Sequence, residues 1–251
     1  KKEFLSTLYN ETLQKDISKL IAGLDALQKS KLGERFCNTS SETKSLAEIV
    51  ENGGLVYVQL NAMKDELSAR LAGKLLLQDL INTVGEKNAN GDQFSNKKCT
   101  LIIDEFSDFA TDNFIKLLNK CRGAGMGVII AYQSSGDLEH VSRVFAKRVS
   151  SNCGIKFFFG TNDPEEAEDM SKRVGTVKGT KMTQKILEDI VQEVGSIRDV
   201  EEFLIHPNDV KNMEIGEVLM LNKWSDTQKY ALLKAPLSRE YTKNEGMTWD
   251  E

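Results

Sequence analysis

The chain has 251 residues, of which 40% are hydrophobic and 28% are charged, a composition typical of soluble globular proteins. Its formal net charge of −5 excludes binding to nucleic acid through overall basicity, so any contact with DNA has to be local. No apolar run approaches the roughly 18 residues that a membrane-spanning helix needs. Four widely separated cysteines and two histidines do not have the spacing of a zinc site, and they favour a reducing cytoplasm.

The N-terminal segment, residues 3–30, is predicted to be an amphipathic helix. Its apolar residues recur near the 3.6-residue period of an α-helix, and polar residues occupy the other face. A glycine and a Ser/Thr cluster then change the composition, which predicts a domain boundary near residue 33.

Beyond this boundary, strand-like and helix-like segments alternate. Helices are predicted at 65–84, 111–125, 138–150 and 163–175, and strands at 53–60, 99–104, 126–133 and 154–161. The last three strands lack polar alternation, as in strands that are buried on both faces. This order predicts an α/β fold with a mostly parallel sheet and helices on both faces.

The C-terminal part of the chain is less regular. Residues 175–185 have the composition of a mobile basic loop, and the pattern at 184–194 favours a helix. Two strands around a polar turn in 217–237 predict a hairpin at the sheet edge. The polar tail, 238–251, is expected to be loose, which leaves 33–237 as the main domain.

Two carboxylates follow the apolar strand in the stretch "LIIDEFSDFA": Asp104 and Glu105. In α/β sheets the functional crevice lies at the carboxyl ends of the parallel strands. Adjacent acids at such an end are typical of nucleoside triphosphatases, in which the first helps to hold Mg²⁺ and the second polarises the attacking water. The same acids are also typical of a capped turn or helix start, and alone they leave both interpretations open.

Two further residues extend the triphosphatase interpretation. Gln133 ends the next strand and is expected beside the carboxylates if the two strands are neighbours. A glutamine there can contact a γ-phosphate or orient water, although it can also be an ordinary polar strand end. Arg122 is expected at a helix C-terminus, where the helix dipole favours a cation. Its alternative role is an arginine finger that reaches the nucleotide of a neighbouring subunit.

Four blocks of the sequence together resemble the TraD/TraG-type coupling proteins of conjugative type IV secretion systems. They are "GGLVYVQLNAM", "LIIDEFSDFA", "LLNKCRGAGMGVIIAYQS" and "SSNCGIKFFFGTNDPEEAEDMSKRVGT". These proteins are hexameric, membrane-anchored ATPases related to the FtsK/HerA translocases. The resemblance covers roughly residues 46–235 and implies a RecA-like motor domain, with residues 1–32 as the last helix of an inserted all-α domain.

The resemblance also implies a role for each candidate residue. Asp104 would lie on the Mg²⁺ side of the site, and Glu105 would be the catalytic base for ATP hydrolysis. Gln133 would act on the phosphate side. Arg122 would act across a subunit boundary.

The phosphate-binding loop of such an ATPase is absent from these 251 residues. It requires G-x-x-x-x-G-K-[ST], and the nearest match, "GTVKGTKMT", has Thr180 between Gly179 and Lys181. We interpret that stretch as a basic surface loop. The membrane anchor of the family is absent as well, so the chain is expected to be the C-terminal part of a longer protein and inactive alone.

The function that the resemblance implies is ATP-driven transfer of single-stranded DNA with its relaxase, or of protein substrates, towards the secretion channel. The intact protein is expected to be a homo-hexamer at the cytoplasmic side of the bacterial inner membrane. Four cations are candidates for DNA contacts or are simply solvated surface side chains: Lys147, Arg148, Lys178 and Lys181. Two alternatives are an FtsK/HerA-type translocase in chromosome partition or repair, and a substrate-receptor platform that does not hydrolyse ATP.

Overall fold

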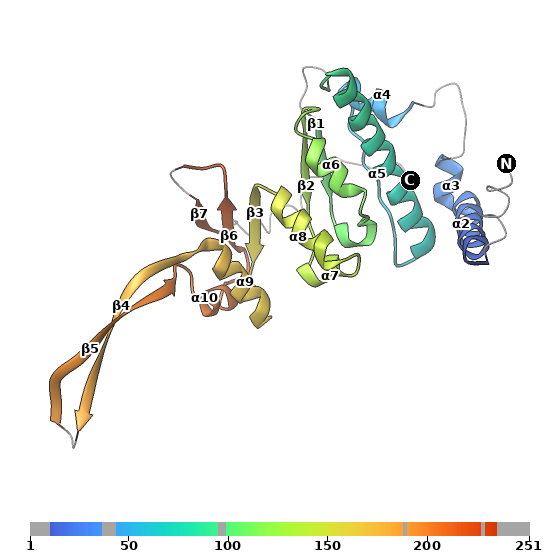
Figure 1. Ribbon diagram of the computed structural model, residues 1–251. Coiled ribbons are helices and arrows are strands. Elements are labelled where there is room, and N and C mark those ends of the chain that lie inside the picture. Colours follow the sequence, from blue (N-terminus) through green and yellow to red (C-terminus); the bar gives the residue numbers. More distant parts are fainter. Residues whose placement is uncertain (1–10, 37–43, 95–98, 188–189, 227–228, 235–251) are drawn as a thin grey trace, which may run out of the picture. The chain divides into compact units, whose positions relative to one another are not determined.

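The computed structural model describes residues 11–36, 44–94, 99–187, 190–226 and 229–234. The chain divides into two compact units, Lys1–Asn152 and Cys153–Glu251, and each is described by itself (Figure 1). The predicted mixed α/β class is confirmed. The predicted loose tail, 238–251, lies outside the described residues.

The first unit contains one pair of strands and a series of helices. In chain order they are α2 (Glu11–Lys29), α3 (Lys31–Phe36), α4 (Leu46–Glu51), α5 (Glu66–Asn90), β1 (Cys99–Ile103), the 3₁₀ helix η1 (Phe106–Phe109), α6 (Phe114–Lys120), β2 (Met126–Ile130), α7 (Ser135–Glu139) and α8 (Arg143–Asn152). The described part of the helix predicted at 3–30 forms α2, and residues 3–10 lie outside the described ranges. The helix predicted at 138–150 is divided into α7 and α8, because Ser134 caps α7 in a capping box and a new helix begins at Arg143.

Strands β1 and β2 pair in parallel, with Cys99 opposite Met126 and Ile103 opposite Ile130. One face of this pair is buried, as Ile103 shows, whereas Ile102 and Ile129 on the other face remain more than half exposed. The core of the unit includes the rings of Phe106, Phe114 and Phe145, all of which are at most 1% exposed.

Helix α5 is the longest helix among the described residues, and its ends have clear causes. The Asp65 side chain accepts a hydrogen bond from the backbone N–H of Ser68, which caps the N-terminus. Gly91 ends the helix at a left-handed φ of 72°. The helix continues beyond the predicted end at residue 84 to Asn90.

The strand predicted at 53–60 is not formed. The segment is extended, but no strand of the described residues pairs with it, and Leu55 and Tyr57 are 93% and 80% exposed. Its β-branched and aromatic residues favour an extended backbone, but a strand also needs a hydrogen-bonded neighbour. Among the described residues, β1 pairs only with β2.

The described residues of the second unit form two antiparallel sheets and two helices. Its elements are β3 (Ile155–Phe159), α9 (Pro164–Val174), β4 (Thr176–Leu187), β5 (Ile190–Phe203), α10 (Pro207–Lys211), β6 (Glu217–Asn222) and β7 (Tyr230–Lys234). Strands β3, β6 and β7 form one sheet in that order. The predicted edge hairpin is confirmed as β6–β7, and parallel pairing is confined to β1–β2 among the described strands.

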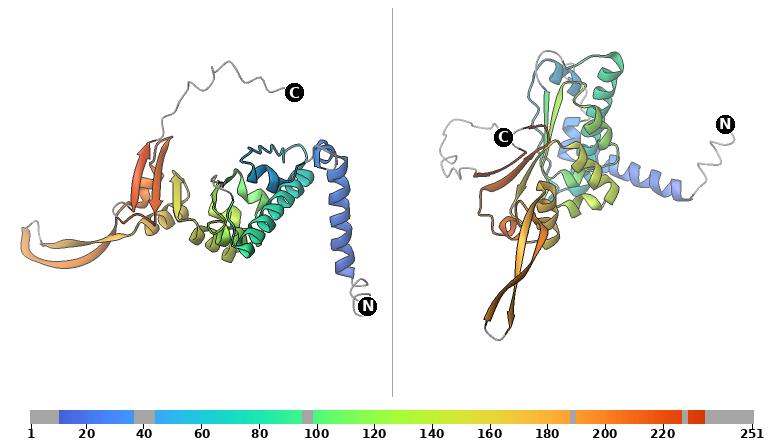
Figure 2. Two further views of the ribbon diagram at one scale, coloured as in Figure 1. Left: turned by 90° about the horizontal axis from the view of Figure 1, so that it is seen from above. Right: turned by 60° about the vertical axis from the view of Figure 1, so that its left-hand side comes forward.

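A long ribbon of β4 and β5 projects from the second unit (Figures 1 and 2). Both the loop predicted at 175–185 and the helix predicted at 184–194 are therefore wrong. The two strands pair in antiparallel from Thr176–Phe203 to Leu187–Ile190, with a register shift between Gln184 and Lys185. Recurrent Thr, Val and Ile residues favour strands here. The helix-like spacing of apolar residues at 184–194 covers only a few residues, and the pairing of β4 with β5 outweighs it.

A candidate nucleotide-hydrolysing site

The acids of "LIIDEFSDFA" lie at the carboxyl end of β1, as predicted. Asp104 and Glu105 directly follow the last strand residue, Ile103, and both side chains are exposed. Glu105 has φ 48° and ψ 48°, and no other non-glycine residue in the described ranges has a positive φ. Such a left-handed backbone is uncommon and strained for a residue with a side chain, and it occurs often at functional sites.

Gln133 meets Glu105 at this end of the sheet. Its Nε2 donates a hydrogen bond to Oε1 of Glu105 over 3.0 Å. The contact follows from the parallel pairing of β1 and β2, which continues past the strands: the Ala131 N–H donates to the Ile103 carbonyl at 2.9 Å. The structure thus brings together two residues that the sequence placed at neighbouring strand ends.

Of the two acids, only Asp104 caps the turn, which was the alternative interpretation for both. Asp104 Oδ1 accepts the backbone N–H of Glu105 at 3.1 Å, a local bond within the turn. Glu105 occupies the N-cap position of η1, but its side chain makes no capping hydrogen bond. Its carboxylate contacts Gln133 instead.

A buried aromatic residue anchors the turn next to Glu105. Phe106 is 0% exposed, and its ring centroid lies 4.4 Å from that of Phe114 and 6.3 Å from that of Phe145. The Phe106 N–H also donates to the Ala131 carbonyl at 2.8 Å. The backbone after Glu105 is therefore fixed to both the core and the end of β2.

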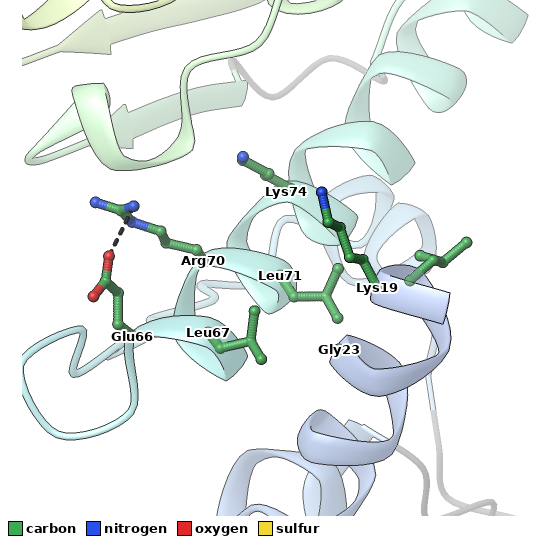
Figure 3. A pocket seen from close by; sticks show the side chains of 8 residues that line it. Lys19, Gly23, Glu66, Leu67, Arg70, Leu71 and Lys74 are labelled. Carbon is green, nitrogen blue, oxygen red and sulfur yellow. Dashed lines mark ion pairs between the residues drawn. The ribbon is translucent and has the colours of Figure 1, made fainter. Parts of the chain in front are cut away.

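Helix α5 contacts the far end of the same turn through residues that the sequence did not single out. Arg70 pairs with Glu66 one helical turn away at 2.8 Å (Figure 3) and with Asp108 of η1 at 2.9 Å. The i, i+4 spacing of Glu66 and Arg70 was readable from the sequence. The bond to Asp108 was not, because it depends on how α5 crosses η1.

Arg122 lies away from the acids. It is exposed and precedes β2, at the amino end of the strand pair, whereas Gln133 follows the carboxyl end. Half-buried thiols occur at this amino end: burial raises the pKa of both Cys99 and Cys121, and for Cys99 the nearby Glu51 carboxylate adds to the rise. The structure therefore does not bring Arg122 into the site formed by Glu105 and Gln133 of the same chain.

The four cations considered for DNA contacts are not gathered in one unit. Lys147 and Arg148 are exposed on α8, and Lys178 and Lys181 are exposed on β4. Lys181 pairs with Glu202 across the ribbon at 3.1 Å. Their assignment to DNA stays a prediction.

A hollow of about 480 Å³ in the first unit lies between α2 and α5 (Figure 3). Leu20, Leu67 and Leu71 supply apolar surface, and Lys19 and Lys74 supply cations. Arg70, which also pairs with Asp108, is part of its lining.

The residues at the strand ends fit Mg²⁺ with a nucleoside triphosphate. Mg²⁺ retains several waters and typically takes one or two carboxylates together with substrate phosphates, which suits the exposed carboxylate of Asp104. No group of three or more His, Cys, Asp or Glu side chains in the described part is placed to hold a metal by itself. Among the same residues, no helix combines the length and apolarity that crossing a membrane takes.

Comparisons with known proteins identify similar chains. Residues 98–214 match the family model described as the TraM recognition site of TraD and TraG. An uncharacterised protein of Mycoplasma pneumoniae is 25% identical over 145 residues, which are 55% of this chain and 94% of that protein.

Solved structures of the plasmid coupling protein TrwB share the fold. The complex with the non-hydrolysable ATP analogue ADPNP matches with a TM-score of 0.57 and 19% identity, and the complex with ADP and Mg²⁺ with a TM-score of 0.55 and 18% identity. Each match covers 82% of this chain and 46% of TrwB. The chain thus spans less than half the length of the solved structures that it matches.

Proposed function

We propose that this chain is of the TraD/TraG coupling-protein type, and that it forms the catalytic half of an ATP-hydrolysing site; the family match over residues 98–214 supports the first part. The observation that carries the proposal is the hydrogen bond between Glu105 and Gln133 at the ends of two parallel strands. The TrwB complexes with ADPNP and with ADP and Mg²⁺ support ATP and Mg²⁺ as the ligands. The phosphate-binding loop would come from a segment outside these 251 residues.

Each residue then has a defined task. ATP would supply the phosphoryl group, and Mg²⁺ would offset the negative charge of the phosphate oxygens. Asp104 would hold Mg²⁺ through water. Glu105 accepts a proton from the attacking water, and Gln133 orients the Glu105 carboxylate and contacts the phosphate side.

The proposed role of the whole protein is the transfer of a conjugation substrate. Single-stranded DNA with its relaxase and relaxosome would be delivered to the type IV secretion channel at the cytoplasmic side of the inner membrane. The family description, a TraM recognition site, supports a relaxosome contact of this chain. The intact protein would act as a homo-hexamer anchored through an N-terminal segment.

The direct test is ATP turnover by the intact protein with Glu105→Gln. We expect kcat to fall by at least about 10²-fold, because a general base typically contributes 10² to 10⁴. Binding of a fluorescent ATP analogue should persist, since the substitution removes a proton acceptor and retains the shape and polarity of the side chain. Asp112→Asn, a change at another exposed acid of the first unit, is the matched control and should retain turnover.

Near-normal hydrolysis by the Glu105→Gln protein would overturn the assignment of the base. If the unsubstituted intact protein binds secretion substrates but does not turn over ATP with or without single-stranded DNA, the ATPase proposal is wrong. The substrate-receptor platform would then be the correct function.

A further inference from the structure

We propose that Arg70 and Gly73 of α5 are positioning residues for Glu105: they hold the 3₁₀ turn that follows it, so that the Glu105 carboxylate stays directed at Gln133. This inference rests on the proposed function for its catalytic meaning. Its structural part concerns only the first unit and can be tested without nucleotide.

The turn needs to be held because Glu105 has a strained backbone. A left-handed residue with a side chain persists only when the surrounding structure fixes it, since relaxation would release the strain. On its near side, Phe106 fixes the turn to the core and to β2. On its far side, Asp108 and Phe109 both contact α5, and within the part of the chain that the structure describes they have no comparable link to a strand.

The first contact is ionic. The Arg70 guanidinium pairs at the same time with Glu66 on its own helix and with Asp108 on the turn, and the Asp108 N–H donates to the Glu105 carbonyl at 3.1 Å. The ion pair with Glu66 (Figure 3) restricts the orientation of the same guanidinium. A displacement of Asp108 therefore acts on the peptide group of Glu105 itself.

The second contact is steric. A Cβ atom on Gly73 would lie 2.5 Å from Cε1 of the Phe109 ring, which is closer than real side chains approach, and at a tight 3.1 Å from Cδ1 of Leu60. Glycine at this position lets the Phe109 ring lie directly on the backbone of α5. Gly73 lies one turn from Arg70 on the same side of α5, so the same side of the helix makes both contacts with η1.

The structural part is tested by hydrogen–deuterium exchange of the full 251-residue chain. With Arg70→Ala, the amides of Phe106 and Asp108 should exchange about threefold to fivefold faster, as expected for loss of a partly exposed ion pair. Asp108→Ala should have the same effect at the Phe106 amide, and the double variant should add little to either, because the two side chains share one interaction. Gly73→Val, which displaces Phe109 without removing a charge, should also accelerate exchange.

Lys74→Ala is the matched control. Lys74 is an exposed cation next to Gly73, lines the same hollow, and makes no ion pair with a described residue. It should leave the exchange of the turn unchanged. Equal exchange in the Arg70→Ala and unsubstituted chains, or equal acceleration by Lys74→Ala, would overturn the inference.

The catalytic part is tested in the intact protein. Arg70→Ala should lower kcat for ATP about threefold to tenfold with little change in KM, because it disturbs the aim of the base and not the binding of phosphate. Arg70→Lys should restore part of the loss. Faster exchange without any fall in kcat would refute the link to Glu105, whereas an intact protein with no ATPase activity at all would refute the proposed function and leave the exchange result standing.

Discussion

The two ends of strand β2 differ in what they present. At the carboxyl end, Gln133 donates to Glu105, and the turn that holds Glu105 is tied to the core and to α5. At the amino end, Arg122 is exposed and the neighbouring thiols are half-buried. The five residues of β2 alone span about 16 Å, which is further than an arginine side chain reaches.

Because of this separation, Glu105 and Gln133 can act together within one chain, whereas Arg122 cannot reach them in the same chain. Glu105 and Gln133 are in contact, so their cooperation needs no partner. Arg122 can act on a nucleotide only if that nucleotide lies at the acids of another subunit. If Arg122 has no such partner, it is a surface cation at the end of α6, where the helix dipole favours it.

The role of Gln133 at the carboxyl end of β2 is tested by Gln133→Ala in the intact protein. The loss of the 3.0 Å hydrogen bond leaves the Glu105 carboxylate free to rotate, and we expect kcat for ATP to fall about tenfold. The matched control is Gln93→Ala, because Gln93 is an exposed glutamine beside Gly125, before the other end of β2. Equal turnover by the Gln133→Ala and unsubstituted proteins would remove Gln133 from the site.

The amino end is tested by the reactivity of its thiols, for which we expect a smaller effect. Because burial raises the pKa of Cys99 and Cys121, less thiolate is present at a given pH in the folded chain than in the unfolded chain. Alkylation by iodoacetamide at pH 8.5 should therefore be several-fold slower than in urea, and its rate should keep rising to a higher pH. Mass spectrometry of the labelled peptides gives each rate. Equal alkylation rates in the folded and the urea-unfolded chain would show that the thiols at this end of β2 are exposed to solvent.

The sequence predicted the positions of the candidate residues at the strand ends, whereas their role in hydrolysis stays a prediction. It did not predict contacts in which a side chain reaches another element. Asp104, Glu105 and Gln133 were placed correctly because an apolar strand ends visibly, and parallel neighbours bring their ends together. Arg70 was missed because its contact with Asp108 depends on how α5 crosses η1.

The fold was predicted unevenly for a similar reason. Continuous apolar runs identified β1, β2 and β3, although each of these strands leaves apolar side chains exposed, such as Ile102, Ile129 and Phe157. The β4–β5 ribbon was missed because its two strands are stabilised mainly by pairing with each other. The polar sequence of each strand does not indicate which segment it pairs with. The segment 53–60 has the pattern of a strand but lacks a partner among the described residues.

The most direct test of whether the two ends of β2 serve different subunits is to mix two variants of the intact protein, Arg122→Ala and Glu105→Gln, each expected to be inactive alone, and to measure ATP hydrolysis. If Arg122 acts on the site of a neighbouring subunit, some interfaces combine an intact Glu105 with an intact Arg122. Random mixing in equal amounts should then restore about a quarter of the normal activity. Lys120→Ala, a change to the last residue of α6, should be active alone. A mixture that assembles normally but stays inactive would contradict the claim that the two ends of β2 serve different subunits.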